Sequence, residues 1–225
     1  MRSLAVRASA GLAQLAVIMW LLIFGAAGSL RFWQGWLYWA VFTACAAVIT
    51  VDLLRRDQAL VERRLRAGPA AEKRLMQRVI QALASVLFGA LMAAPCLDYR
   101  FAGSHVPPAV VIAANVLVVA GFAIVGAVFR ENTFTSATIE VASDQRVITT
   151  GPYRIVRHPM YAGAMVLLAA TPPALGSWWS LLVMPLFIGV IVWRLLDEER
   201  LLAATLPGYV EYLATTRARL IPGIW

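Results

Sequence analysis

Long apolar stretches alternate with short polar segments along the chain, and this alternation predicts a bundle of membrane-spanning helices. A helix of roughly 20 apolar residues crosses the hydrocarbon core of a bilayer, which is about 30 Å thick. Stretches of about this length cover residues 10–30, 36–54, 79–97 and 108–129. Basic residues precede the first stretch, as in a cleaved signal peptide, but the density of the later stretches favours a retained helix.

The apolar stretch at residues 160–196 is longer than one crossing requires, and TPPALGS at residues 171–177 interrupts it. Proline and glycine at this position predict a turn between two helices. We therefore expect a helical hairpin whose second helix returns to the surface where the first begins. The predicted fold class is all-α, a polytopic transmembrane bundle of five or six spans, with short amphipathic helices in the tail at residues 201–225.

Composition and charge agree with this fold and indicate its orientation. Hydrophobic residues make up 61% of the chain and the mean hydropathy is +0.74, which excludes a soluble globular protein. Residues 55–78 carry eight basic and three acidic side chains, so the positive-inside rule places them in the cytoplasm, against anionic lipid headgroups. Counting crossings makes both termini and residues 130–158 cytoplasmic, in an inner or plasma membrane. Lipid contact accounts for the net charge of +8 without a nucleic-acid partner.

Some polar and sulfur-bearing residues carry little functional information. The basic run at residues 55–78 is typical of a solvated, lipid-facing surface. His105 lies in a predicted outer loop, residues 98–107, where a lone histidine is structural or merely exposed. Cys45 and Cys96 fall in apolar stretches and no cluster of cysteine and histidine occurs, so we expect neither a disulfide framework nor a metal site.

The segment GPYRIVRHPMYAG, from Gly151 to Gly163, lies where polar sequence meets the last apolar stretch. Pro159 fixes its own φ and biases His158 away from the α region, and Pro152 acts in the same way on Gly151. Charged and polar side chains at a membrane border are costly without partners. We therefore expect a loop held in one shape at the mouth of the helix bundle. The preceding QRVITT, residues 145–150, is compatible with a short extended piece.

The predicted hairpin brings DEER, residues 197–200, back to the surface that carries Arg157 and His158. The acidic pair has two interpretations, an interfacial cap with Arg194 and Glu198 as an i,i+4 ion pair, or carboxylates that bind a cation or a pair of ribose hydroxyls. Arg157 is either a carboxylate or phosphate ligand or a snorkelling side chain. The residues alone indicate a membrane-embedded site that opens to the cytoplasm, and they do not specify its reaction.

A family resemblance narrows these alternatives. GPYRIVRHPMYAG, then DEERLL at residues 197–202, LPGYVEY at 206–212 and RLIPGIW at 219–225, resemble the isoprenylcysteine carboxyl methyltransferase family. That family belongs to a broader set of integral membrane methyltransferases, which includes phospholipid N-methyltransferases. The resemblance covers roughly residues 130–225. It implies a catalytic methyltransferase core there, with residues 1–129 as N-terminal transmembrane helices.

The resemblance also implies a cofactor and a set of site residues. The cofactor is S-adenosylmethionine, which leaves as S-adenosylhomocysteine, and the lipid-like or prenylated acceptor enters from the bilayer. Arg157, with Glu198 or Glu199, would be catalytic and lie nearest the methyl-accepting group. Cofactor-binding positions would be Gly151, Tyr153, His158, Pro159, Tyr161, Glu198, Glu199, Tyr209 and Tyr212. Carboxylate and aromatic faces stabilise a sulfonium cation.

The resemblance leaves the acceptor open. Transfer to an ionised carboxylate, as in isoprenylcysteine O-methylation, needs no general base, whereas an amine must lose a proton. Phospholipid N-methyltransferases carry a GxG element in an earlier span, and here Gly121 and Gly126 are separated by FAIV instead. We therefore expect a carboxylate acceptor, with phospholipid N-methylation as an alternative. An NADPH-dependent membrane reductase of related fold and a non-enzymatic membrane scaffold are further alternatives.

Overall fold

The computed structural model describes residues 3–65, 70, 72, 74–101, 103–135 and 145–225. Within these ranges the chain is helical and contains no strand, which confirms the predicted all-α class. The long helices are α1 (Leu4–Ala27), α2 (Trp33–Arg56), α4 (Leu75–Phe101), α5 (Pro108–Glu131), α6 (Pro159–Ala174) and α7 (Met184–Thr205). The short ones are α3 (Gln58–Leu65), α8 (Tyr209–Thr215) and the 3₁₀ turns η2 (Gly151–Arg154) and η3 (Trp179–Val183).

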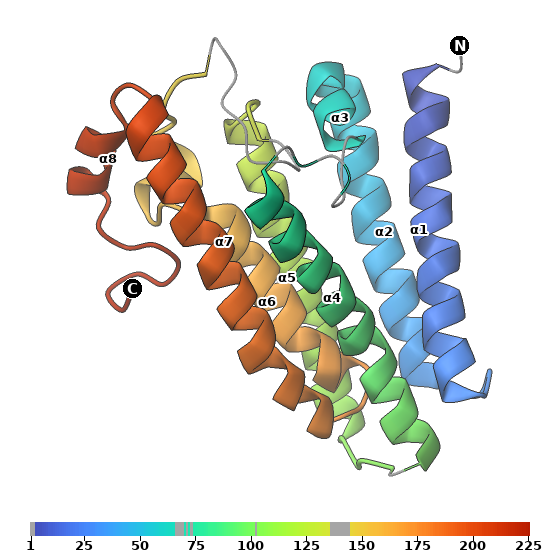
Figure 1. The fold of residues 1–225 in the computed structure, drawn as a ribbon. Coiled ribbons are helices and arrows are strands. Elements are labelled where there is room, and N and C mark those ends of the chain that lie inside the picture. The colour runs from blue at the N-terminus through green and yellow to red at the C-terminus, as the bar shows by residue number, and fades with distance from the viewer. Residues whose placement is uncertain (1–2, 66–69, 71, 73, 102, 136–144) are drawn as a thin grey trace.

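Five helical segments in the described part of the chain are long and apolar enough to cross a membrane. They are α1, α2, α4, α5 and the continuous segment Trp179–Thr205, which joins η3 to α7. The remaining long helix, α6, has 16 residues and falls short of the roughly 20 that a full crossing requires. Length and composition identify these five, and α6 lies beside α5 and α7 in the bundle as the first arm of the hairpin (Figure 1).

The predicted hairpin is present and turns within TPPALGS, although α6 continues through Pro172 and Pro173. Helix α6 ends at Ala174, Gly176 turns the chain at a φ of +77°, and α7 runs back along the bundle (Figure 1). By contrast, α4 extends to Phe101, so the predicted outer loop at residues 98–107 is shorter than expected. The extension has a physical cause, because Asp98 is buried and accepts hydrogen bonds from Ser177 Oγ at 2.5 Å and from the backbone N–H of Ser104 at 3.3 Å.

Part of the segment at residues 55–78 packs on the bundle. Helix α3 has a buried apolar side, and its Leu60 and Val61 join Leu53 of α2 and Phe129 of α5 in one apolar cluster. Beyond α3, Arg74 reaches Asp197 of α7. Arg55, Arg56, Arg74 and Arg78 are nevertheless exposed, and contact of this basic segment with lipid headgroups stays a prediction. The expected extended piece at residues 145–150 is not part of a strand.

Helices α5 and α6 pack most closely of all the helix pairs, and they do so through glycine. A Cβ on Gly121 of α5 would lie 2.8 Å from the carbonyl oxygen of Gly163 in α6, closer than real Cβ contacts allow. The absence of a side chain therefore brings the two backbones together. Because α6 begins directly after His158, this contact sets the position of the His158 loop relative to the end of α5.

The polar parts of the molecule gather at one end of the bundle. The start of α1, the whole of α3 and α8 all lie at the same end in Figure 1. This arrangement matches the predicted topology, in which both termini share a side with residues 55–78. That this side faces the cytoplasm remains a prediction from charge.

Candidate functional site

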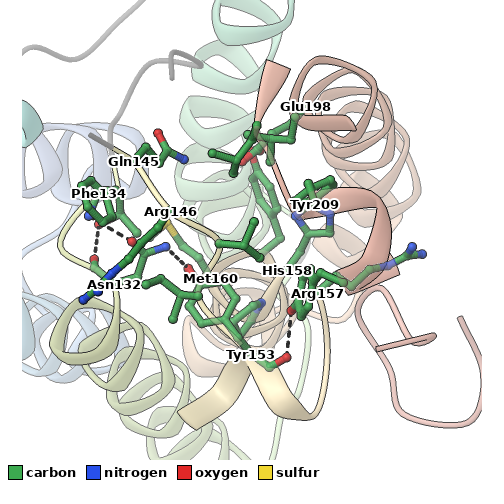
Figure 2. Close-up of a pocket in the computed structure, with 18 of the residues that line it drawn as sticks. Asn132, Phe134, Gln145, Arg146, Tyr153, Arg157, His158, Met160, Glu198 and Tyr209 are labelled. Carbon is green, nitrogen blue, oxygen red and sulfur yellow. Dashed lines mark hydrogen bonds between the residues drawn. The ribbon is translucent and has the colours of Figure 1, made fainter. Parts of the chain in front are cut away.

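A pocket opens at this polar end between η2, the start of α6, the end of α7 and α8. It encloses about 900 Å³ of space, part of which is open to solvent. Figure 2 shows Asn132, Phe134 and Arg146 on one side of it and His158, Glu198 and Tyr209 on the other. The remaining lining residues are Thr135, Gln145, Val147, Ile148, Tyr153, Arg157, Pro159, Met160, Tyr161, Arg194, Leu202, Leu206 and Tyr212.

The loop that precedes α6 has the fixed shape that its prolines predict. His158 has φ −124° and ψ 63°, outside the α region, and Pro159 then begins α6. Gly151 has a φ of +56°, and a Cβ there would lie 2.7 Å from Glu131 Oε2. The backbone conformation at residue 151 therefore favours glycine, and any other residue there would also displace the Glu131 side chain.

The C-terminal tail holds this loop through its backbone. The N–H of Arg157 donates to the carbonyl oxygen of Ala218 at 2.9 Å, and the N–H of His158 donates to that of Arg219 at 3.0 Å. The tail is itself closed, since Ile221 donates to the carbonyl oxygen of Trp225 and the Arg219 guanidinium lies 5.1 Å from the Trp225 ring. Sequence reasoning missed this role of the tail.

Glu199 is the centre of a buried polar cluster behind the pocket wall. Its carboxylate accepts hydrogen bonds from Arg219 Nε at 2.9 Å and His158 Nε2 at 3.2 Å, and it forms an ion pair with Arg157 Nε at 3.1 Å. The side chains of Arg157 and Glu199 are 8% and 9% exposed, so this charge pair is almost fully desolvated. Glu199 does not line the pocket. Its carboxylate holds Arg157 and His158, which do line it.

Glu198, the other member of the predicted glutamate pair, lies in the pocket wall. Its Oε2 accepts a hydrogen bond from the Tyr161 hydroxyl at 2.7 Å, and that hydroxyl accepts one from Arg194 Nε at 3.1 Å. The expected Arg194–Glu198 pairing therefore runs through Tyr161. The two glutamates are adjacent in sequence, but Glu198 lies in the pocket wall and Glu199 lies behind it.

Three tyrosines, Tyr153, Tyr209 and Tyr212, contribute to the pocket wall. The Tyr212 hydroxyl donates to the backbone oxygen of Tyr153 at 2.8 Å, and Asn132 Nδ2 donates to the Tyr153 hydroxyl at 2.9 Å. The buried Tyr209 hydroxyl has no hydrogen-bond partner in the described part of the chain. Burial raises the pKa of Tyr153 and of Tyr209 above the usual range of a phenol, and it raises the pKa of Tyr212 to about 12. All three phenols are therefore neutral at physiological pH.

The structure thus brings most of the sequence-predicted residues together. Tyr153, Arg157, His158, Pro159, Tyr161, Glu198, Tyr209 and Tyr212 all line one pocket. Gly151 and Glu199 do not line it and shape it from behind. Lining residues that sequence reasoning left unassigned include Asn132, Phe134, Gln145, Arg146 and Met160. Met160 lies inside the RHPMY motif, but the only signal for the others was the polar segment after α5, which does not say where that segment folds.

Comparison with known families points to a reaction. Residues 109–206 match the family model described as phospholipid methyltransferase. The match runs from the start of α5 to the end of α7 and includes Arg157, His158, Tyr161 and both glutamates. A search of curated proteins finds no match. Together, the family match and the five candidate spans support an integral membrane methyltransferase.

Proposed function

We propose that this chain transfers a methyl group from S-adenosylmethionine to a carboxylate on a hydrophobic or lipid-like acceptor, as in isoprenylcysteine O-methylation. One observation carries the proposal. The two motifs RHPMY and DEER, which lie far apart in sequence, contribute His158, Tyr161 and Glu198 to a single pocket, and all three residues lie in the region that matches a methyltransferase family.

The residues of the pocket suit this cofactor. S-adenosylmethionine supplies an electrophilic methyl group on a sulfonium cation. The buried Tyr209 hydroxyl has an unused hydrogen-bonding capacity, which a bound ligand with polar groups would satisfy. Glu198 offers a carboxylate to a cation or to hydroxyl groups. The residues that would hold the cofactor are Tyr153, His158, Pro159, Tyr161, Glu198, Tyr209 and Tyr212, with Gly151 and Glu199 supporting them from behind.

The chain's own residues then have simple tasks. Glu199 fixes Arg157 and His158 in place, and Arg157 orients the carboxylate of the acceptor. An ionised carboxylate needs no base, so positioning and the exclusion of water supply the rate. Apolar side chains such as Met160, Leu202 and Leu206 line the same pocket and limit its water.

Charge favours a carboxylate over an amine acceptor. The lining contains three arginines (Arg146, Arg157 and Arg194), whose guanidinium groups bind carboxylates and not amines, although Arg157 also pairs with Glu199 and Arg194 with Glu72. Phospholipid N-methylation is the second candidate, because the matched family model carries that description. The two reactions differ in their protons, since methylation of a protonated amine releases one. The rate of amine methylation, divided by the rate with a carboxylate acceptor that carries the same hydrocarbon chain, would therefore rise about tenfold per pH unit at pH values below the amine pKa.

The first test is calorimetric titration of the detergent-purified protein with S-adenosylhomocysteine, with NADPH titrated in parallel. We expect saturable binding of S-adenosylhomocysteine alone. Binding of NADPH alone would instead support a membrane reductase. Binding of neither would leave the site a structural feature of a non-enzymatic membrane protein.

Tyr209→Phe tests the fit of the cofactor. We expect the Kd for S-adenosylhomocysteine to rise about three- to tenfold, because one hydrogen bond to the ligand is lost. The melting temperature should not fall, because the hydroxyl has no partner within the described protein and its burial is costly. Tyr212→Phe is the matched control, since it removes a bond to Tyr153 and should lower the melting temperature. Unchanged ligand binding by Tyr209→Phe would remove Tyr209 from the cofactor site.

A further inference from the structure

A buried arginine connects the basic segment after α3 to the pocket wall. Three nitrogens of the Arg194 guanidinium each have a different partner. Nη2 lies 3.1 Å from Glu72 Oε1, Nη1 donates to Gln77 Oε1 at 3.0 Å, and Nε donates to the Tyr161 hydroxyl at 3.1 Å. The side chains of Arg194 and Glu72 are 12% and 2% exposed, so solvent screens this ion pair very little.

The chain of contacts continues into the candidate site. Because the Tyr161 hydroxyl accepts from Arg194, its own proton is directed to Glu198 Oε2, 2.7 Å away. Glu198 then has one oxygen bonded to Tyr161, and a carboxylate with one oxygen so fixed can still accept a hydrogen bond from a ligand in the pocket. The order Glu72, Arg194, Tyr161, Glu198 thus runs from a segment outside the matched family region to the pocket.

A second set of contacts anchors the same segment at a different point. Arg74 donates to both oxygens of Asp197, at 2.8 and 3.1 Å, and Gln77 also donates to Asp197. Asp197 does not line the pocket, and the Arg74 side chain is 44% exposed. Arg74 therefore holds the segment on α7 without direct contact with Arg194, Tyr161 or Glu198, and it reaches Arg194 only through Asp197 and Gln77.

We propose that Glu72 is a positioning residue for the candidate site, which holds Arg194 in the orientation that fixes the Tyr161 hydroxyl and, through it, the carboxylate of Glu198. A buried guanidinium needs a counter-charge, and Glu72 supplies it from outside the hairpin. Without that charge, Arg194 gains by turning towards water or towards Glu198 directly. Either movement releases the Tyr161 hydroxyl from its present geometry.

Comparing Glu72→Gln with Arg74→Gln separates positioning from simple anchoring, because each removes one charged contact between the same segment and α7. This readout rests on the proposed function, since the probe is S-adenosylhomocysteine in a calorimeter. We expect Glu72→Gln to raise the Kd about tenfold and Arg74→Gln to leave it within about twofold. Glu72→Asp, which keeps the charge, should recover part of the affinity. Equal losses in Glu72→Gln and Arg74→Gln would reduce Glu72 to an anchor and overturn the proposal.

A double-mutant cycle on unfolding in mixed micelles tests the same proposal without a ligand. The structure shows contacts of Glu72 and of Tyr161 with Arg194, so their effects on stability should be coupled through it. We expect Glu72→Gln to cost less stability in a Tyr161→Phe background than in the wild type, whereas Arg74→Gln should cost the same in both. Additive effects of Glu72→Gln and Tyr161→Phe would overturn the proposal. If the wild type fails to bind S-adenosylhomocysteine, the proposed function fails, and this cycle alone decides the role of Glu72.

Discussion

Replacing Glu199 with alanine is expected to destabilise the protein strongly and to release its C-terminal tail. Three side chains from two other segments converge on this carboxylate, namely Arg157, His158 and Arg219. Removing it leaves the buried Arg157 without its counter-charge, a change that costs about 3–5 kcal/mol when one partner of a buried pair is lost. Ligand binding should fall as a consequence, because the His158 loop loses its support.

Denaturation in detergent and limited trypsin digestion measure this effect. We expect a lower midpoint for Glu199→Ala and faster cleavage after Arg217 and Arg219. Glu198→Ala is the matched control, since the same substitution one residue earlier removes a group in the pocket wall. It should lose S-adenosylhomocysteine binding with a much smaller loss of stability. The reverse pattern, with Glu198 essential for stability and Glu199 only for binding, would contradict the arrangement of the two carboxylates.

Gly121→Ala is the second change with a large expected effect, because it separates α5 from α6. The new Cβ would lie 2.8 Å from the carbonyl oxygen of Gly163 and 2.8 Å from Leu167 Cβ. Backbone cannot yield without movement of the whole helix, so overpacking should cost about 1–3 kcal/mol. Since α6 begins at Pro159, the same shift should displace His158 and weaken S-adenosylhomocysteine binding.

Gly126→Ala gives the comparison for this measurement on the same helix. A Cβ at residue 126 would lie 3.9 Å from the nearest side-chain atoms of Ile49, an ordinary contact. Alanine also has a higher helix propensity than glycine, so Gly126→Ala should keep or raise the melting temperature. Equal melting temperatures for the two variants would show that α5 and α6 tolerate a wider separation.

The topology was predictable because it depends on local patterns. The break at residues 171–177 and the length of the apolar stretch around it were enough to predict the hairpin. The conformation of the His158 loop was predictable in the same way, since Pro159 restricts the residue before it. Both inferences need only neighbouring residues and the thickness of a bilayer.

The division of labour between the glutamates was not predictable. Successive residues on a helix point about 100° apart, so the packing of α7 against its neighbours decides which one faces the pocket. The roles of Glu72 and Arg219 were hidden for a similar reason. Glu72 lies in a basic segment whose composition suggests lipid contact, and Arg219 lies in a tail predicted only to be amphipathic; the folded chain shows their partners, Arg194 and Glu199.

The pairing of the His158 loop with the tail has a consequence for the biogenesis of the protein. Helices α6 and α7 contain the apolar sequence that enters the membrane, and both are complete before residues 218 and 219 are synthesised. The hairpin can therefore be inserted while the loop still lacks its two backbone partners. Insertion of the hairpin and completion of the site are then separate steps of biogenesis, and the second waits for the tail.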